Sequence, residues 1–152
     1  MRIIAHRANI NGSNYSKENK LAQIKKCLDL GYDVEIDVRF INKNLFLGHD
    51  NPDEIISENE IFALKDKCWI HCKNLEAINY FKKFKESFNY FWHENDKYTL
   101  TSKGYIWTYP GESLDVNSIC VMPESTIPIK NLSDLKNKNF AGICTDFPNL
   151  II

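Results

Sequence analysis

The chain has almost no net charge and no long apolar run. Its 19 Lys and Arg residues nearly balance 20 Asp and Glu residues, which leaves a formal net charge of -1. A balanced chain has no sequence-wide attraction to nucleic acid, so we expect no nucleic-acid partner. No apolar stretch is long enough to cross a bilayer or to resemble a signal peptide. We therefore expect no stable membrane insertion and a cytoplasmic location.

Cysteine usage argues against a disulfide framework. The chain holds five cysteines, an odd number, and lacks the pattern of a small secreted domain. Cys68 and Cys72 have three residues between them, which is neither the spacing of a redox motif nor the usual spacing of a zinc site. We expect reduced, structural thiols.

Length and composition suit one globular α/β domain. The 152 residues, 43% hydrophobic and 26% charged, can form a single domain over residues 1–152 with a hydrophobic core. Short apolar runs alternate with amphipathic stretches, which favours a largely parallel sheet. The runs predict strands over residues 2–6, 33–39, 68–73, 89–93, 105–109, 118–122 and 140–144, with a short extension over 44–48.

Helices are fewer than strands in this pattern. One helix is expected to begin near Ser16 and to end at Gly31. A second is expected to follow an N-cap at Asn74, and a brief third to lie around residues 133–136.

The first third of the chain carries an ordered set of polar residues between its apolar runs. His6 beside Arg7 places a proton carrier next to a side chain that can grip a phosphate. Glu35 and Asp37 are two apart, so on a strand they share a face and can hold one hard cation. His49, just past another apolar run, completes an acid/base pair. These residues together can assemble a phosphoester-cleaving site.

Their order resembles the glycerophosphodiester phosphodiesterase family, whose motifs run His-Arg-Gly, Glu-Asn-Thr, Glu-x-Asp and His-Asp. The counterparts here are His6-Arg7-Ala8, Glu18-Asn19-Lys20, Glu35-Ile36-Asp37 and His49-Asp50. Later segments are similar to the family's Glu-x-Lys, Trp-Thr and closing Gly-x-x-Thr-Asp-x-Pro motifs; they are Ile70-His71-Cys72-Lys73, Trp107-Thr108-Tyr109 and Gly142-Ile143-Cys144-Thr145-Asp146-Phe147-Pro148. The chain departs from the pattern at Ala8, where the family has glycine, and at His71, where the family has a third acidic metal ligand.

The resemblance implies a TIM-type (β/α) barrel with its site at the carboxyl ends of the strands. A complete barrel of this type typically needs roughly 250 residues. The expectation is therefore a reduced or trimmed barrel with a largely parallel sheet, or one whose open side a partner subunit covers, as in a homo-oligomer.

The activity that the resemblance implies is metal-dependent cleavage of a soluble, glycerophosphodiester-like small molecule. The products would be an alcohol and either a phosphomonoester or a cyclic phosphate. Glu35 and Asp37 would hold Mg²⁺ or Ca²⁺. His71 would be the third ligand, which shifts the preference toward Mn²⁺, or would touch the substrate only.

Further roles fall on cationic, imidazole and aromatic side chains. Arg7 and Lys73 would bind the phosphate, and His6 and His49 would divide the proton transfers. Trp107 is expected in the wall of the substrate pocket, with Tyr109 beside it. Trp92 is a third aromatic near this wall, but a place in the core is the expectation for it.

Two other functions remain open at this stage. The chain is alternatively a catalytically inactive barrel that binds a phosphorylated ligand, or a phospholipase-like or sphingomyelinase-D-like lyase. The latter would need exposed apolar loops at the mouth.

Several motifs also have purely structural interpretations. Glu35-x-Asp37 can be a solvated strand edge, His49 to Pro52 a polar turn, and His71 a core histidine. His93 to Asp96 has the composition of a metal site, but a polar loop explains it equally. Glu18 and Asn19 are expected to serve the start of the first helix.

Overall fold

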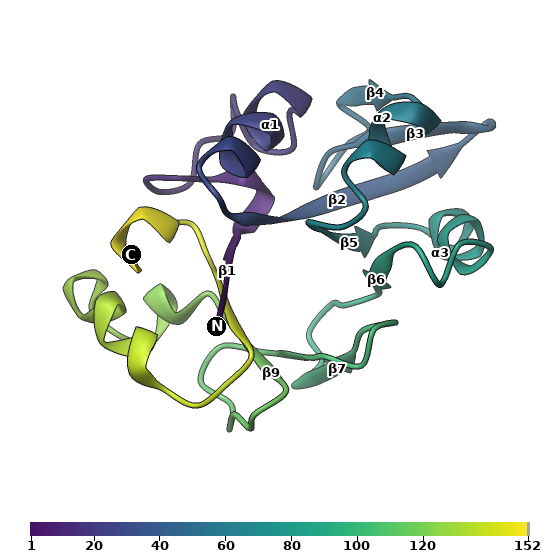
Figure 1. Cartoon of the computed structure of the whole chain (residues 1–152). Helices are drawn as coiled ribbons and strands as arrows, with labels where there is room; N and C mark the ends of the chain where they lie inside the picture. Colours follow the sequence, from purple (N-terminus) through teal and green to yellow (C-terminus); the bar gives the residue numbers. More distant parts are fainter. Residues whose placement is uncertain (152) are drawn as a thin grey trace.

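The computed structural model describes residues 1–151 and shows a mixed α/β fold built on a ten-stranded sheet (Figure 1). The strands are β1 Arg2–Ala5, β2 Asp33–Ile41, β3 Asn44–Leu47, β4 Glu54–Ile56, β5 Cys68–Cys72, β6 Asn89–Phe91, β7 Tyr98–Leu100, β8 Ile106–Thr108, β9 Ser118–Val121 and β10 Gly142–Thr145. The α-helices are α1 Leu21–Asp29, α2 Glu58–Ala63 and α3 Leu75–Lys82; the 3-10 helices are η1 His6–Ala8, η2 Pro123–Ser125, η3 Ile129–Asn137 and η4 Pro148–Leu150.

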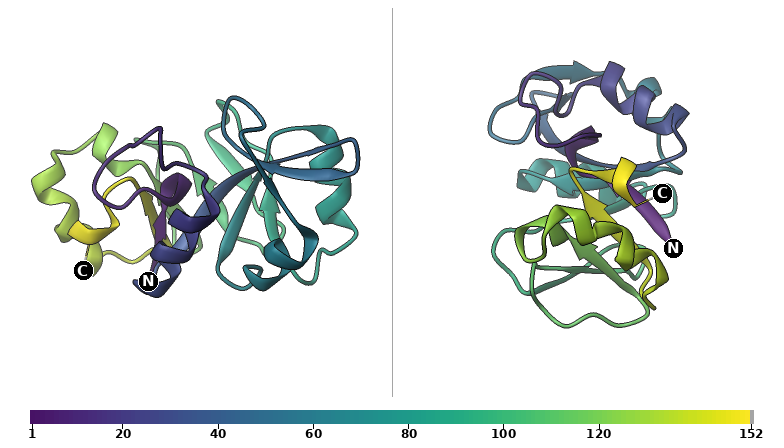
Figure 2. Two further views of the ribbon diagram at one scale, coloured as in Figure 1. Left: turned by 90° about the horizontal axis from the view of Figure 1, so that it is seen from above. Right: turned by 90° about the vertical axis from the view of Figure 1, so that its left-hand side faces the viewer.

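Most of the sheet is parallel, as expected. The parallel strands follow one another in the order β6, β5, β2, β1, β10, β9 and β8. Strand β1 is central because it pairs with β2 on one side and with β10, from the far end of the chain, on the other. Figure 2 shows the pairing of β1 with β10 from two sides, with the yellow carboxyl-terminal segment beside the purple first strand. Parallel strands of one sheet end at a common edge, so β1, β2 and β5 present their carboxyl ends together.

Three strands pair in the antiparallel sense. Strands β3 and β4 extend the carboxyl half of β2, and β7 folds back on β8. Beyond β7, the backbone N–H of Ser102 donates to the carbonyl of Tyr90 in β6 at 2.9 Å. Within residues 1–151 no strand ladder joins β6 to β7 or β8, so the sheet is not shown to close into a barrel.

The two faces of the sheet carry separate hydrophobic clusters. On the outer face, Val34, Ile36 and Val38 of β2 pack in one cluster with Ile24 of α1 and Phe81 of α3. The inner cluster draws side chains from strands along the whole row; its buried members are Ile4, Trp69, Phe91, Trp107, Ile119, Val121 and Cys144. The sheet must therefore curve, since the rings of Phe91 and Trp107 meet at 4.5 Å from near its two ends.

The alternation expected for β2 and β5 is confirmed. Glu35 and Asp37 are buried on the inner side of the sheet, while the residues between them join the outer cluster. In β5, Trp69 joins the inner cluster and Ile70 the outer one. The interpretation of Glu35-x-Asp37 as a solvated edge is wrong, because both side chains are buried.

Several element boundaries differ from expectation. Helix α1 begins at Leu21 rather than near Ser16, and it has no side-chain N-cap. Strands β4 and β7 and helix α2 had not been predicted. The brief helix near residue 133 is a longer 3-10 helix, η3. By contrast, Asn74 caps α3 by accepting from the backbone N–H of Ala77, as expected.

Two further expectations concern cysteines and membrane spans. All five cysteines are free, and four of them are buried. Among residues 1–151, none of the helices combines the length and the apolar character that crossing a bilayer requires.

Candidate active site

The turn after β1 places His6 and Arg7 at the carboxyl edge of the sheet. Arg7 and Ala8 both have left-handed backbone conformations, with φ of 50° and 65°. This turn directs the backbone N–H of Arg7 to Glu35 Oε2 at 3.0 Å. Glycine adopts such angles freely, which explains why the family pattern has glycine where this chain has the buried Ala8.

Arg7 lies among three carboxylates. Its guanidinium is 3.5 Å from both Glu18 Oε2 and Asp37 Oδ2. Although burial lowers the pKa of Arg7, the charges of Asp37, Glu35 and Glu18 outweigh it and raise the pKa further. Arg7 therefore stays cationic, and its charge offsets the negative charges of Asp37, Glu35 and Glu18.

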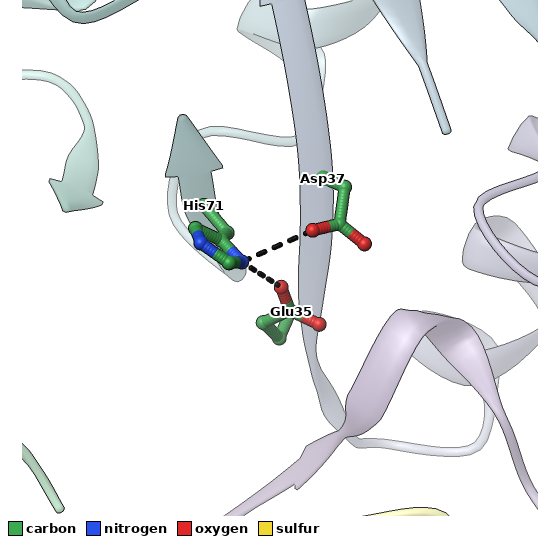
Figure 3. A group of neighbouring side chains, drawn as sticks. All are labelled: Glu35, Asp37 and His71. Atoms are coloured by element: carbon green, nitrogen blue, oxygen red, sulfur yellow. Dashed lines mark ion pairs between the residues drawn. The ribbon is translucent and has the colours of Figure 1, made fainter. Parts of the chain in front are cut away.

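Glu35, Asp37 and His71 form a compact cluster across two paired strands (Figure 3). In the β2–β5 ladder Asp37 stands opposite His71. His71 Nδ1 lies 3.0 Å from Asp37 Oδ1 and 3.6 Å from Glu35 Oε1. One ligand atom from each residue falls within 4.8 Å of the others. His71 has hydrogen-bonding partners on both ring nitrogens, and it also lines a cavity.

The orientation of the His71 ring is fixed from its far side. Nε2 lies 2.8 Å from the backbone carbonyl of His93, and a carbonyl only accepts, so Nε2 carries a proton that it donates. In a neutral ring, Nδ1 then directs a lone pair at Asp37 Oδ1. As long as Nδ1 carries no proton, that buried oxygen has no hydrogen-bond donor among residues 1–151. Two facing lone pairs repel, so either a proton or a cation belongs between them.

The acidic cluster shifts the pKa values of its members in opposite directions. Burial lowers the pKa of His71, but its contacts with the Asp37 and Glu35 carboxylates outweigh burial and raise the pKa to about 9. Burial likewise raises the pKa of Asp37, while His71, Arg7 and His49 together hold it well below its usual range. Without a bound ion, the proton between Asp37 and His71 therefore belongs to the imidazole.

His6 is oriented by a carboxylate from the other end of the chain. His6 Nδ1 lies 2.8 Å from Asp146 Oδ1, which also accepts from the Asn9 side chain. Glu124 in turn accepts from the backbone N–H of Asp146 at 2.7 Å. Burial lowers the pKa of His6, but the bond to Asp146 and the charges of Glu35 and Asp146 raise it above its ordinary value. The Nδ1 partner leaves Nε2 of His6 for other contacts.

His49 sits on a loop that Arg39 holds. The guanidinium of Arg39 donates to the carbonyls of Gly48, His49 (2.7 Å) and Asp50 (3.2 Å). The imidazole of His49 itself bonds to the exposed Asp50 at 2.8 Å. This segment is a turn, as its composition indicated, yet it also lines the cavity described next.

One cavity of about 490 Å³ unites these residues. Its lining is His6, Arg7, Glu35, His49, His71, Lys73, His93, Glu94, Asn95, Trp107, Tyr109, Pro110, Val121 and Met122. Lys73, which lines the cavity, places its Nζ 3.9 Å from Oδ1 of the buried Asp37. The structure thus gathers at one place the imidazoles, carboxylates and cations that the sequence singled out.

Some residues do not take the places expected of them. Glu18 and Asn19 do not serve the start of α1; Asn19 donates to Asp37 Oδ2 at 2.9 Å and accepts from the Asp37 backbone N–H. Trp92 is not in the core, because 40% of it is exposed, and it does not line the cavity. His93 and Glu94 line the cavity, so the loop that they occupy belongs to the site.

Asp146 and Arg39 bond to candidate site residues, a role that sequence reasoning missed. Asp146 lies in the closing Thr-Asp-x-Pro motif, so a signal existed, but nothing in the chain assigns His6 as its partner. Arg39 shares the inner face of β2 with Glu35 and Asp37 by strand alternation, and that periodicity was its only signal.

Comparisons with known proteins give one structural match. Neither a family model nor a curated protein matches the chain. The structure is similar to the crystal structure of a candidate glycerophosphodiester phosphodiesterase from Galdieria sulphuraria. The TM-score is 0.48 and the identity 11%, over 97% of this chain and 94% of that chain.

Proposed function

We propose that the chain is a metal-dependent phosphodiesterase that acts on a soluble phosphodiester of the glycerophosphodiester kind. The observation that supports this most is the cluster of Glu35, Asp37 and His71, because two of its members, Glu35 and His71, line one cavity together with His6 and His49. Two carboxylates with an imidazole suit a divalent cation, and two further imidazoles suit proton transfer.

The acidic cluster has the properties of a cation site. When the His71 ring is neutral, the buried Asp37 Oδ1 has no hydrogen-bond donor in the described part of the chain, and the Nδ1 lone pair of His71 faces it. A divalent ion held by Glu35, Asp37 and His71 would satisfy both and would polarise a phosphoryl oxygen. One imidazole in the ligand set favours Mn²⁺ over Mg²⁺ or Ca²⁺, because nitrogen ligands suit softer ions. The His93 carbonyl supports this role by fixing which nitrogen of His71 is free.

The remaining cavity residues supply charge and protons. Arg7 and Lys73 bind the non-bridging oxygens of the phosphodiester and offset the charge that moves toward the leaving oxygen. One of His6 and His49 takes the proton of the attacking water or neighbouring hydroxyl, and the other protonates the departing alcohol oxygen. Asp146 keeps His6 in the tautomer that leaves Nε2 available.

The curved sheet fits a reduced (β/α) barrel in this proposal. Strand β7 lies between β8, with which it pairs, and β6, which Ser102 contacts. An antiparallel strand would then fill the position that a strand–helix unit fills in a complete barrel. This replacement shortens the chain without opening the carboxyl-end mouth.

The test is hydrolysis of bis(p-nitrophenyl) phosphate and of glycerophosphodiesters by protein freed of metal and then supplied with Mn²⁺, Mg²⁺ or Ca²⁺. We expect turnover only with a divalent ion, and its loss in His6→Ala and Asp37→Asn. Asp134→Asn, an exposed aspartate on η3, is the matched control and should keep full activity. Binding of phosphate esters without turnover under every metal would instead identify a ligand-binding protein.

A further inference from the structure

The cavity has two chemically different walls, and each comes from neighbouring strands. The turn after β1, strand β2, the end of β5 and the loops that carry His49 and His93 supply the polar wall. Strands β8 and β9, also neighbours, and the residues just after them supply the apolar wall. Its residues are Trp107, Tyr109, Pro110, Val121 and Met122, none of which carries a charge.

The apolar wall is partly open to solvent. Trp107 and Val121 are buried in the inner cluster and form its base. Tyr109, just past β8, leaves 40% of its surface exposed, and its ring lies 6.1 Å from that of His93. An exposed aromatic ring at the rim of a cavity is a surface that a ligand can cover.

Met122, a residue of the apolar wall, has an unfavourable backbone conformation. Its φ of 46° and ψ of 51° are left-handed, which a long side chain rarely adopts. The backbone N–H of Met122 donates to the Cys144 carbonyl at 2.7 Å, and its own carbonyl accepts from Ser125. These bonds over-determine the strained residue, as is common in ligand sites. The adaptable thioether side chain lines the cavity.

The cavity is larger than a phosphate group requires. Its volume of about 490 Å³ lies in the range that encloses whole small molecules rather than single ions. Because the cations all lie on the polar wall, the phosphodiester must sit there. An alcohol group esterified to that phosphate then reaches the apolar wall.

We infer that the wall formed by Trp107, Tyr109, Pro110, Val121 and Met122 binds an apolar, ring- or alkyl-bearing alcohol portion of the substrate. This inference rests on the proposed function, since it takes the phosphate site from it. It narrows the substrate class from polar glycerol esters to phosphodiesters with an apolar group on one side. Tyr109 and Met122 are the residues that would determine this specificity.

The test is a binding measurement that needs no turnover. Phenylphosphonate and methylphosphonate carry the same anionic group and differ only in the apolar part, and neither can be hydrolysed. Calorimetric titration of the whole protein with Mn²⁺ present should give about tenfold tighter binding of phenylphosphonate, from the extra apolar area buried. Tyr109→Ala and Met122→Ala should remove most of that advantage and leave methylphosphonate binding unchanged.

Two variants serve as controls, one for loss of folding and one for the removal of an exposed tyrosine elsewhere on the surface. Tyr109→Phe keeps the ring and should keep the preference. Tyr98→Ala removes another exposed tyrosine, which does not line the cavity, and should have no effect. Equal affinity for the two phosphonates would overturn the inference while the hydrolysis test still decides the proposed function. If neither phosphonate binds, the phosphate site itself is wrong and both proposals fall.

Discussion

His6 and Asp146 lie 140 residues apart in the chain, yet their side chains meet at 2.8 Å. The pairing of β1 with β10 makes this contact, because it sets Ala5 opposite Thr145 and so aligns the next residue of each strand. An imidazole whose Nδ1 faces a buried carboxylate keeps one tautomer and stays basic enough to move a proton near neutral pH.

Replacing Asp146 with Asn should weaken proton transfer by His6 while the imidazole itself stays in place. The neutral amide takes away the charge that raises the pKa of His6, so this pKa should fall toward or below its ordinary value. We expect a loss of roughly 10- to 100-fold in kcat. The measurements are hydrolysis rates and an NMR titration of His6, with Asp134→Asn as the control. An unchanged pKa of His6 would contradict the role given to Asp146.

Arg39→Lys should loosen the loop that carries His49. A lysine ammonium cannot span the three carbonyls that the guanidinium binds, so kcat should fall several-fold. The free energy of unfolding should fall by about 1 kcal/mol. Arg2→Lys is the matched control, because Arg2 pairs with Asp33 at the amino-terminal end of β1. Equal effects of the two substitutions on kcat would show that Arg39 does not position His49.

Gly48→Ala should damage the same loop by a steric route. A methyl group at Gly48, where φ is 140°, would collide with the Asn51 carbonyl. Gly31 also has a positive φ, of 90°, but has nothing within 4 Å of the added methyl. Both substitutions should cost about 1 kcal/mol in backbone strain. The Gly48 variant should lose about 2 kcal/mol more in denaturant unfolding, and most of its activity.

The stability of the metal-free protein should fall as the pH rises from about 6.5 to about 9. His71 is protonated in the folded protein up to its raised pKa of about 9 but loses its proton near 6.5 when unfolded. Its contribution is complete below pH 6.5 and disappears above 9. The total is of the order of 3 kcal/mol. Denaturant unfolding of metal-free protein across this range measures it.

Cation binding should show the opposite pH dependence. An ion on His71 Nδ1 must displace the proton there, so the affinity for Mn²⁺ should rise by about tenfold per pH unit until pH reaches about 9. Calorimetric titration at several pH values measures this rise. Affinity that does not change with pH would mean that His71 is not a ligand.

Local patterns predicted the parts of the fold whose signals are local. Strand alternation identified the inward side of β2 correctly, because burial of one face imposes a period of two. Asn74 was recognised as a cap by its residue type and position. Helix α2 was missed although Ser57 and Glu60 form a capping box that the sequence displays. Strand β7 was also missed; its Tyr98 and Leu100 are exposed, so the strand has no buried face that would mark it.

The site depended more on distant contacts. Seven of the eight candidate residues line one cavity: His6, Arg7, Glu35, His49, His71, Lys73 and Trp107. The eighth, Asp37, is buried and contacts His71. The helix-start interpretation of Glu18 and Asn19 failed because tertiary partners, Arg7 and Asp37, outcompete a local cap. The partner of His6 was unpredictable from sequence, because it follows from the register of two strands at opposite ends of the chain.

The ladder between β1 and β10 also bears on how the protein folds. Strand β1 is made first but gains its second neighbour only from residues 142–145, so a very large loop must close before the sheet is complete. Such non-local parallel pairing slows folding and leaves a strand edge unprotected in the meantime. During synthesis on the ribosome, this edge of β1 stays open until β10 has been made, and the contact of His6 with Asp146 in the candidate site can form only then.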